Sequence, residues 1–197
     1  MYSEIQPFPP MRRSPRFLRS LVIASILILP ALTIGCTPKI PNKITSQEMD
    51  LYREWLKQRF ANKAPEHLYL DDQTFRFDPL RQEGCGKALH TNDDVSNSLM
   101  RALHNLGNTD YEIDVSPKAV HIPWPYQVLN VRDFPRPVEG LHVISFSRVA
   151  FNGSGRSALF AVNDLCGPQC GRGRAVSATK ENDAWRFKDS TTCSWEY

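Results

Sequence analysis

The sequence predicts a single α+β domain in which two helices precede a mainly antiparallel meander of about four strands. Apolar residues recur at helical spacing in the first half of the chain, and β-branched or alternating stretches separated by turn sequences fill the last third. Residues 46–197 are long enough to form one domain with its own core.

Both predicted helices are marked by capping signals. Thr45 and Glu48 form a capping box, so the first helix is predicted at residues 46–62, before Pro65. Its apolar positions are Met49, Leu51, Tyr52, Trp55, Leu56 and Phe60. The second helix begins near Asn92 or Asp93 and ends at Gly107, the expected site of a left-handed cap. Its apolar stripe is Val95, Leu99, Leu103 and Leu106.

Strand signals in the middle of the chain are short. His67–Leu70 reads as a short strand, and the alternation over Tyr111–Val115 favours an edge strand with one wet face. Between Pro117 and Pro137, five prolines forbid a long central strand. We expect an ordered loop there, with at most short strands around His121 and Val128.

The predicted meander occupies the C-terminal third. Its strands are Leu141–Phe151, Ser157–Val162, Arg174–Lys180 and Ala184–Phe187, with turns at Asn152–Gly155 and Glu181–Asp183. Helices that precede such a sheet are expected to cover one face of it. By element order alone, this arrangement is similar to the cystatin-like or NTF2-like layout.

The N-terminus has the order of a secretory signal. Four arginines (Arg12, Arg13, Arg16 and Arg19) precede the 14-residue apolar run Leu21–Ile34, which is short for a transmembrane helix. Thr33–Cys36 resembles the lipobox of bacterial lipoproteins. That resemblance implies that residues 1–35 are cleaved and that Cys36 carries the lipid; the alternative is an ordinary signal peptide cut elsewhere.

The lipid anchor would hold the domain at a membrane through a tether, residues 36–45. Because Thr37 and not Asp follows the cysteine, the resemblance favours the periplasmic face of the outer membrane. Cleavage would leave 20 basic and 20 acidic residues, since the signal holds four of the 24 basic residues and one of the 21 acidic ones. A net charge of zero gives no indication of a nucleic-acid partner.

Four cysteines remain in the domain, and an oxidising compartment predicts two disulfides among three connectivities. We favour Cys166 with Cys170, which requires Gly167–Gln169 to turn back, and Cys85 with Cys193. The second bridge would close a loop of about 100 residues.

Catalytic and metal motifs are weak. Cys166 and Cys170 lack the spacing and following helix of a thioredoxin motif, although Arg172 and Arg174 could still lower a thiol pKa. Ser154 lacks the nucleophile-elbow pattern, and Asp71 and Asp72 read as a turn. Four histidines could serve as zinc ligands beside the cysteines: His90, His104, His121 and His142. Their spacing does not match that of a zinc site, so we predict no metal and no cofactor.

Stiff aromatic and basic side chains are the best candidates for a contact surface. Trp124 and Tyr126 lie in the proline-rich segment, Trp195 and Tyr197 at the end of the chain, and Arg172 and Arg174 beside the paired cysteines. Core packing is the alternative for the aromatic residues.

Three segments together carry a family resemblance: Ser147–Asn152, Ala158–Phe160, and Cys166–Gly173 with Trp185. They resemble the C-terminal signature of uncharacterised bacterial envelope proteins over about residues 145–187; Ser177–Lys180 and Cys193–Trp195 depart from it. The resemblance implies a β meander with paired cysteines and brings no activity. We therefore predict a non-catalytic binding or assembly module of the cell envelope. The alternative is an envelope hydrolase or thiol-dependent enzyme that uses Cys166, Cys170 or an aspartate.

Overall fold

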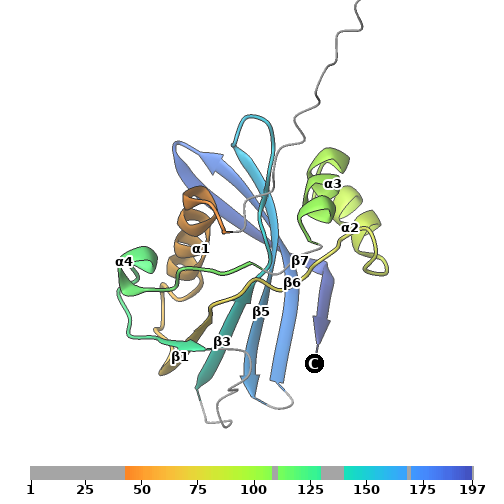
Figure 1. Cartoon of the computed structure of the whole chain (residues 1–197). Coiled ribbons are helices and arrows are strands. Elements are labelled where there is room, and N and C mark those ends of the chain that lie inside the picture. The colour runs from red at the N-terminus through yellow and green to blue at the C-terminus, as the bar shows by residue number, and fades with distance from the viewer. Residues whose placement is uncertain (1–42, 108–110, 130–139, 168–169, 197) are drawn as a thin grey trace, which may run out of the picture. The chain divides into compact units, whose positions relative to one another are not determined.

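Helices lie on both sides of a mixed sheet in this computed structural model (Figure 1). It describes residues 43–107, 111–129, 140–167 and 170–196, all within one unit, Pro38–Tyr197. The described helices are α1 (Ser46–Arg59), α2 (Cys85–Asn92), α3 (Asn97–Leu106) and α4 (Pro117–Val120). The described strands are β1 (His67–Asp71), β2 (Gln127–Leu129), β3 (Leu141–Phe146), β4 (Ala150–Phe151), β5 (Ser157–Gly167), β6 (Cys170–Glu181) and β7 (Ala184–Glu196).

The α+β class is confirmed, and the sheet is larger than predicted. Its order is β2-β1-β3-β5-β6-β7, with β4 paired to β5. The C-terminal strands pair antiparallel, as expected, but β1 lies parallel to both β2 and β3. The first predicted strand therefore becomes an inner strand that extends the meander.

Helix α1 forms where the capping box indicates. The Thr45 amide donates to Glu48 Oε2 (2.8 Å), and the Glu48 amide donates to Thr45 Oγ1 (3.2 Å). The helix ends at Arg59, about one turn earlier than predicted. Leu51, Tyr52 and Trp55 are buried against the sheet. Burial of a large apolar side chain stabilises the folded state by about 1.5–3 kcal/mol.

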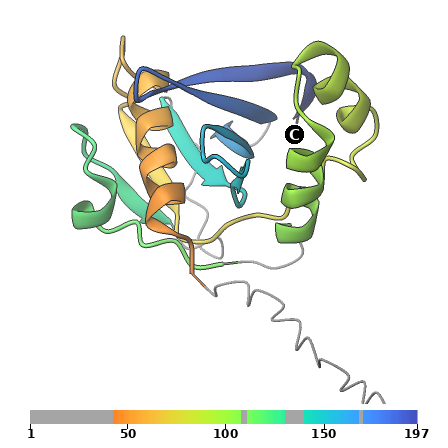
Figure 2. The ribbon, with the colours of Figure 1, turned by 90° about the horizontal axis from the view of Figure 1, so that it is seen from above.

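The expectation that the helices share one face is wrong. Leu159, Ala161 and Ala175 of the sheet pack with α2 and α3, whereas the alternate residues Phe160 and Val162 pack under α1. Seen from above, the strands run between α1 on one side and α3 on the other (Figure 2). The alternation of strand side chains explains how one sheet serves two apolar layers.

The second predicted helix is observed as α3, which starts at Asn97, four or five residues later than expected, with Ser96 as its N-cap. Helix α2 was not predicted; only Cys85 and Leu89 of its side chains are buried, which is too few for a clear apolar stripe. Gly107 follows α3 but is right-handed, with φ −71°, so the expected left-handed cap is wrong. Glycine is required there because a Cβ would lie 2.6 Å from the Phe77 carbonyl oxygen.

The two predicted hairpin turns are confirmed. The Gly155 amide donates to the Asn152 carbonyl (2.9 Å), and Asn182 and Asp183 adopt positive φ between β6 and β7. The strands are longer than the sequence indicated, because β5 reaches Gly167 and β7 reaches Glu196. The predicted run Leu141–Phe151 is split into β3 and β4 at Ser147–Val149.

The edge strand predicted in the middle of the chain is wrong. Tyr111–Val115 forms no strand: its side chains alternate between buried and exposed as expected, but among the described residues Glu112 makes only isolated bridges to Lys43 and Gln73. His121 lies at the left-handed end of the single-turn helix α4, which is compatible with the expectation of at most a short strand there. The short strand around Val128 is confirmed as β2.

The signal, residues 1–35, Cys36, most of the tether, Tyr197, and Pro135 and Pro137 lie outside the described residues. No helix in the described part of the chain is long and apolar enough to cross a membrane.

Candidate functional site

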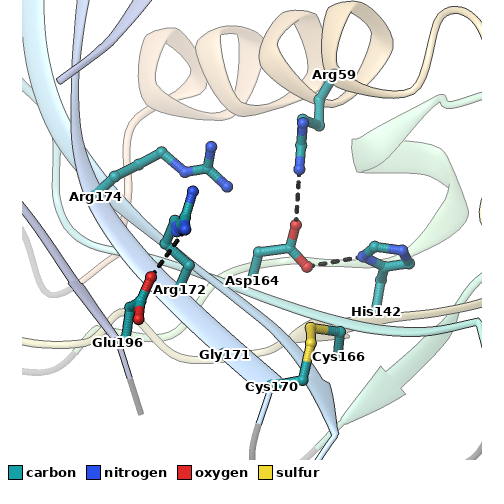
Figure 3. Close-up of a pocket in the computed structure, with 9 residues that line it drawn as sticks. All are labelled: Arg59, His142, Asp164, Cys166, Cys170, Gly171, Arg172, Arg174 and Glu196. Atoms are coloured by element: carbon teal, nitrogen blue, oxygen red, sulfur yellow. Dashed lines mark hydrogen bonds and ion pairs between the residues drawn. A yellow bond between two sulfur atoms is a disulfide. The ribbon is translucent and has the colours of Figure 1, made fainter. Parts of the chain in front are cut away.

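A cleft of about 500 Å³ lies where the α1 face of the sheet extends beyond the end of that helix. On β3, β5 and β6 the residues under the helix are apolar, as at Ile144, Val162 and Val176. Further along the same face, polar side chains take their place: His142, Asp164, Arg172 and Arg174. Arg59, the last residue of α1, reaches over them (Figure 3). We call this site the arginine cleft.

Asp164 is the buried anchor of the arginine cleft. It is only 5% exposed, and its carboxylate oxygens lie 2.8 Å from His142 Nδ1 and 3.3 Å from Arg59 Nη2. Burial alone would raise the pKa of Asp164, but the hydrogen bonds and charges of His142 and Arg59 outweigh it, so the pKa lies below its usual value. The side chain is therefore a carboxylate at neutral pH.

The ionised carboxylate determines the orientation of His142. Since a carboxylate only accepts, His142 Nδ1 carries the proton, and Nε2 is left with its lone pair when the ring is neutral. The edge of the ring also packs against Phe60, with ring centroids 5.4 Å apart. This fixed imidazole can accept a hydrogen bond or a proton from a molecule in the cleft.

Arg172 and Arg174 project from alternate positions of β6. Arg172 donates to Glu196 at 2.8 Å, and the side chains of Arg172 and Glu196 are mostly exposed. Arg174 donates from Nη1 to Asp189 at 2.8 Å, while its side chain is only 12% exposed. Arg174 Nε is buried and has no hydrogen-bond partner among the described residues.

The cleft is bounded at one end by the Cys166–Cys170 disulfide, which joins the ends of β5 and β6 (Figure 3). The second disulfide, Cys85–Cys193, joins the start of α2 to β7 and is buried. Both favoured pairings are confirmed. The segment after Cys170 is strand β6 and not a helix, so the thioredoxin comparison fails structurally as well.

The predicted aromatic surface does not join the arginine cleft. Trp124 is half-buried against Phe60, with ring centroids 6.0 Å apart, and lines a separate depression with Lys57 and His121. The hydroxyl of Tyr126 donates to the Val115 carbonyl at 2.7 Å. Trp195 packs flat over Gly173, where a Cβ would overlap its ring. Of the predicted contact residues that the structure describes, only Arg172 and Arg174 line one site together.

The other residues considered for chemistry are dispersed. His104 binds Asp78 (2.8 Å), His90 Nδ1 lies near the Val95 carbonyl, and Asp71 points to the face opposite α1. The prediction that Asp71 belongs to a turn is wrong, because it is the buried last residue of β1. No group of three or more potential metal ligands occurs in the part of the chain that the structure describes.

Sequence reasoning missed the pair His142 and Asp164 and the contribution of Arg59. Asp164 lies outside the predicted strand Ser157–Val162, and its distance from His142 depends on the register in which Ile144 opposes Asp164. The available signal was that His142 lies inside the predicted strand Leu141–Phe151 and Asp164 just beyond the predicted strand Ser157–Val162. Without the register, that signal could not bring them together.

Comparison of this chain with models of protein families, with curated proteins and with solved structures finds no match.

Proposed function

We propose that the chain is an exported, lipid-anchored protein of the cell envelope whose domain is a non-catalytic binding module. Its ligand is a small molecule bearing carboxylate or phosphate groups, held in the arginine cleft. The signal-like N-terminus and the two disulfides support the compartment, because disulfides persist in oxidising environments. We also propose that the chain belongs to the family of bacterial envelope proteins whose C-terminal signature it resembles, and that its domain has a cystatin-like or NTF2-like layout.

The observation that carries the ligand class is the buried Arg174 Nε without a partner among the described residues. Leaving a buried charged donor unsatisfied costs free energy, so such a group in a cleft indicates a missing acceptor. Arginine presents donors in a planar fork that matches carboxylate and phosphate oxygens. An oxyanion is therefore the group best suited to Arg174.

The neighbouring charges favour the same ligand. Arg172 shares its charge with Glu196, whose side chain is 74% exposed and free to swing into solvent when a ligand displaces it. Asp164 is already committed to His142 and Arg59 and holds both side chains at the cleft. Three guanidinium groups thus surround a cavity within the size range of small-molecule sites.

Calorimetric titration of the mature lipoprotein with inorganic phosphate and with citrate tests the ligand class. We expect binding that Arg174→Leu weakens by about tenfold or more, the loss typical of a charge-assisted hydrogen bond. The matched control is Arg186→Leu, which removes an exposed arginine 3.8 Å from Glu181 on the same sheet. Absence of binding by either anion at millimolar concentration, or equal affinity in both variants, would contradict the proposal.

The anchor is tested separately by metabolic labelling with a palmitate analogue. We expect label on the wild-type protein and none on Cys36→Ser, which should also leave the membrane fraction. Labelling of Cys36→Ser at the wild-type level would refute lipidation at this residue.

A thiol-dependent function is the second candidate, favoured by the exposed Cys170 and its bridge to Cys166 in the same cleft as His142. A substrate thiolate would attack one sulfur and break the bridge, forming a mixed disulfide. The second thiolate of that substrate would then attack the substrate sulfur of the mixed disulfide and release the enzyme cysteine. The products are a substrate disulfide and two reduced cysteines. Oxidation of a dithiol peptide by the protein, lost in Cys166→Ala/Cys170→Ala, would establish this function. A hydrolase that works through an aspartate receives less support, because Asp164, the one aspartate lining the described part of the cleft, is already bonded to His142 and Arg59.

A further inference from the structure

A second cavity, also of about 500 Å³, lies on the face of the sheet opposite α1. Its floor is a row of polar residues across three strands: Asp71 of β1, Ser145 of β3 and Asn163 of β5. The register aligns them, since Leu70 opposes Ile144 and Ser145 opposes Asn163. We call this site the Asp71 cavity.

All three floor residues are buried, with 6%, 7% and 8% of their surface exposed. Polar groups on a sheet face otherwise used for apolar packing need partners. Asp71 Oδ1 accepts the Gln73 amide at 3.0 Å, and Ser145 donates to the Asp71 carboxylate. Asn163 Oδ1 is buried and has no hydrogen-bond partner in the described part of the chain.

The floor offers two acceptors beside the amide donors of Asn163. They are Asp71 when it is ionised and the unpaired Oδ1 of Asn163, whereas Ser145 has used its one donor. Burial raises the pKa of Asp71 above its usual value. Arg76 lies at the rim, where it is exposed and has an interaction of its own.

Apolar side chains line one part of the cavity wall, and Gln73, Thr74 and Arg76 line the rest. Phe75, Leu129, Val143 and Leu165 form the apolar part, and the Phe75 ring lies edge-on to Trp195 at 6.5 Å. The Phe75 amide also donates to the Phe146 carbonyl at 2.9 Å, so this wall is fixed to the sheet. Apolar walls around a few convergent polar groups are typical of small-molecule sites.

We propose that the Asp71 cavity binds a small organic amine, with its ammonium group on Asp71 and Asn163 and its apolar body against Phe75 and Val143. An ammonium group has three donors and no acceptor, which complements these two acceptors. A carboxylate or phosphate ligand would instead face the charge of Asp71. The site is distinct from the arginine cleft, because consecutive residues of β5 point to opposite faces and Asn163 and Asp164 thus serve different cavities.

Calorimetric titration of the mature lipoprotein with benzylamine and with its uncharged analogue benzyl alcohol tests the proposal, with each probe also titrated into detergent alone. We expect benzylamine to bind at millimolar concentration or below and benzyl alcohol to bind at least tenfold more weakly. Asn163→Leu, which removes the unpaired acceptor at similar volume, should weaken benzylamine binding by about tenfold or more.

Two measurements keep this test separate from that of the arginine cleft. Arg174→Leu, on the other face, should leave benzylamine affinity unchanged, and the melting temperature of Asn163→Leu reports whether that variant folds. If Asn163→Leu does not fold, Val143→Phe, which narrows the cavity without touching the floor, should abolish binding instead. No binding of benzylamine, equal binding of benzyl alcohol, or unchanged affinity in a folded cavity variant would overturn the proposal, whatever the result with phosphate.

Discussion

Glu48 and Arg148 form a buried ion pair that connects the start of α1 to the segment between β3 and β4. Their exposed fractions are 1% and 3%. Arg148 donates to Glu48 through Nε (2.6 Å) and Nη2 (3.1 Å), and the Val149 amide donates to the same carboxylate (3.1 Å). The guanidinium also lies 4.1 Å from the centre of the Tyr111 ring. Glu48 thus caps its own helix and accepts from a distant segment.

Arg148→Met should lower the free energy of unfolding by about 3–5 kcal/mol, because it leaves the Glu48 carboxylate buried without its cation. Equilibrium urea unfolding measures the loss. Glu48→Gln/Arg148→Met should recover part of it, since the remaining group is neutral. The control is Lys57→Met, which breaks a half-exposed pair with Glu54 (3.0 Å) and should cost under about 1 kcal/mol. Similar losses for Arg148→Met and the control would contradict this reading.

Asp164 predicts a specific dependence of stability on pH. Its pKa is lowered in the folded state, so its contribution is fully present above the unfolded value of about 4 and is lost as the pH falls toward the folded value. The difference in unfolding free energy between wild type and Asp164→Asn should therefore be larger at pH 5, about one unit above that value, than below about pH 4. Urea unfolding at several pH values measures it, and a difference that grows toward acid pH would be inconsistent with a lowered pKa.

At the scale of elements, the sequence predicted those parts that local chemistry determines. The capping box placed α1, and the turns at Asn152–Gly155 and Glu181–Asp183 placed the C-terminal hairpins. The sequence did not predict which distant segments pair. Strand β1 lies beside β3 in a parallel register that no local pattern encodes. The same limit applied to the site, where Arg172 and Arg174 were predicted but His142 and Asp164 required the register of β3 and β5.

The junction after α3 offers a test of packing between elements. Gly107→Ala should destabilise the fold by about 1–3 kcal/mol, because the added Cβ would meet the Phe77 carbonyl, a backbone atom that cannot rotate away. Gly153→Ala is the matched control, since nothing lies within 4 Å of a Cβ there, and it should be neutral or slightly stabilising. Thermal unfolding of both variants measures the contrast; equal melting temperatures would show that the junction relaxes freely.

For the whole domain, the two disulfides should differ in their effect on stability. Cys85 and Cys193 are 108 residues apart, whereas Cys166 and Cys170 are four apart. In the chain-entropy model, the long loop is worth about 5 kcal/mol and the short one about 2 kcal/mol. Cys85→Ala/Cys193→Ala should therefore lower the unfolding free energy more than Cys166→Ala/Cys170→Ala. Urea unfolding without reductant measures both, and the reverse order would contradict this ranking.

The long bridge also determines how the domain responds to proteolysis. Because Cys85 is bonded to Cys193, a single cut anywhere in the chain between them leaves both fragments covalently attached. A nicked molecule would thus keep α2 fastened to the final strand and run as one species on a denaturing gel until a reducing agent is added.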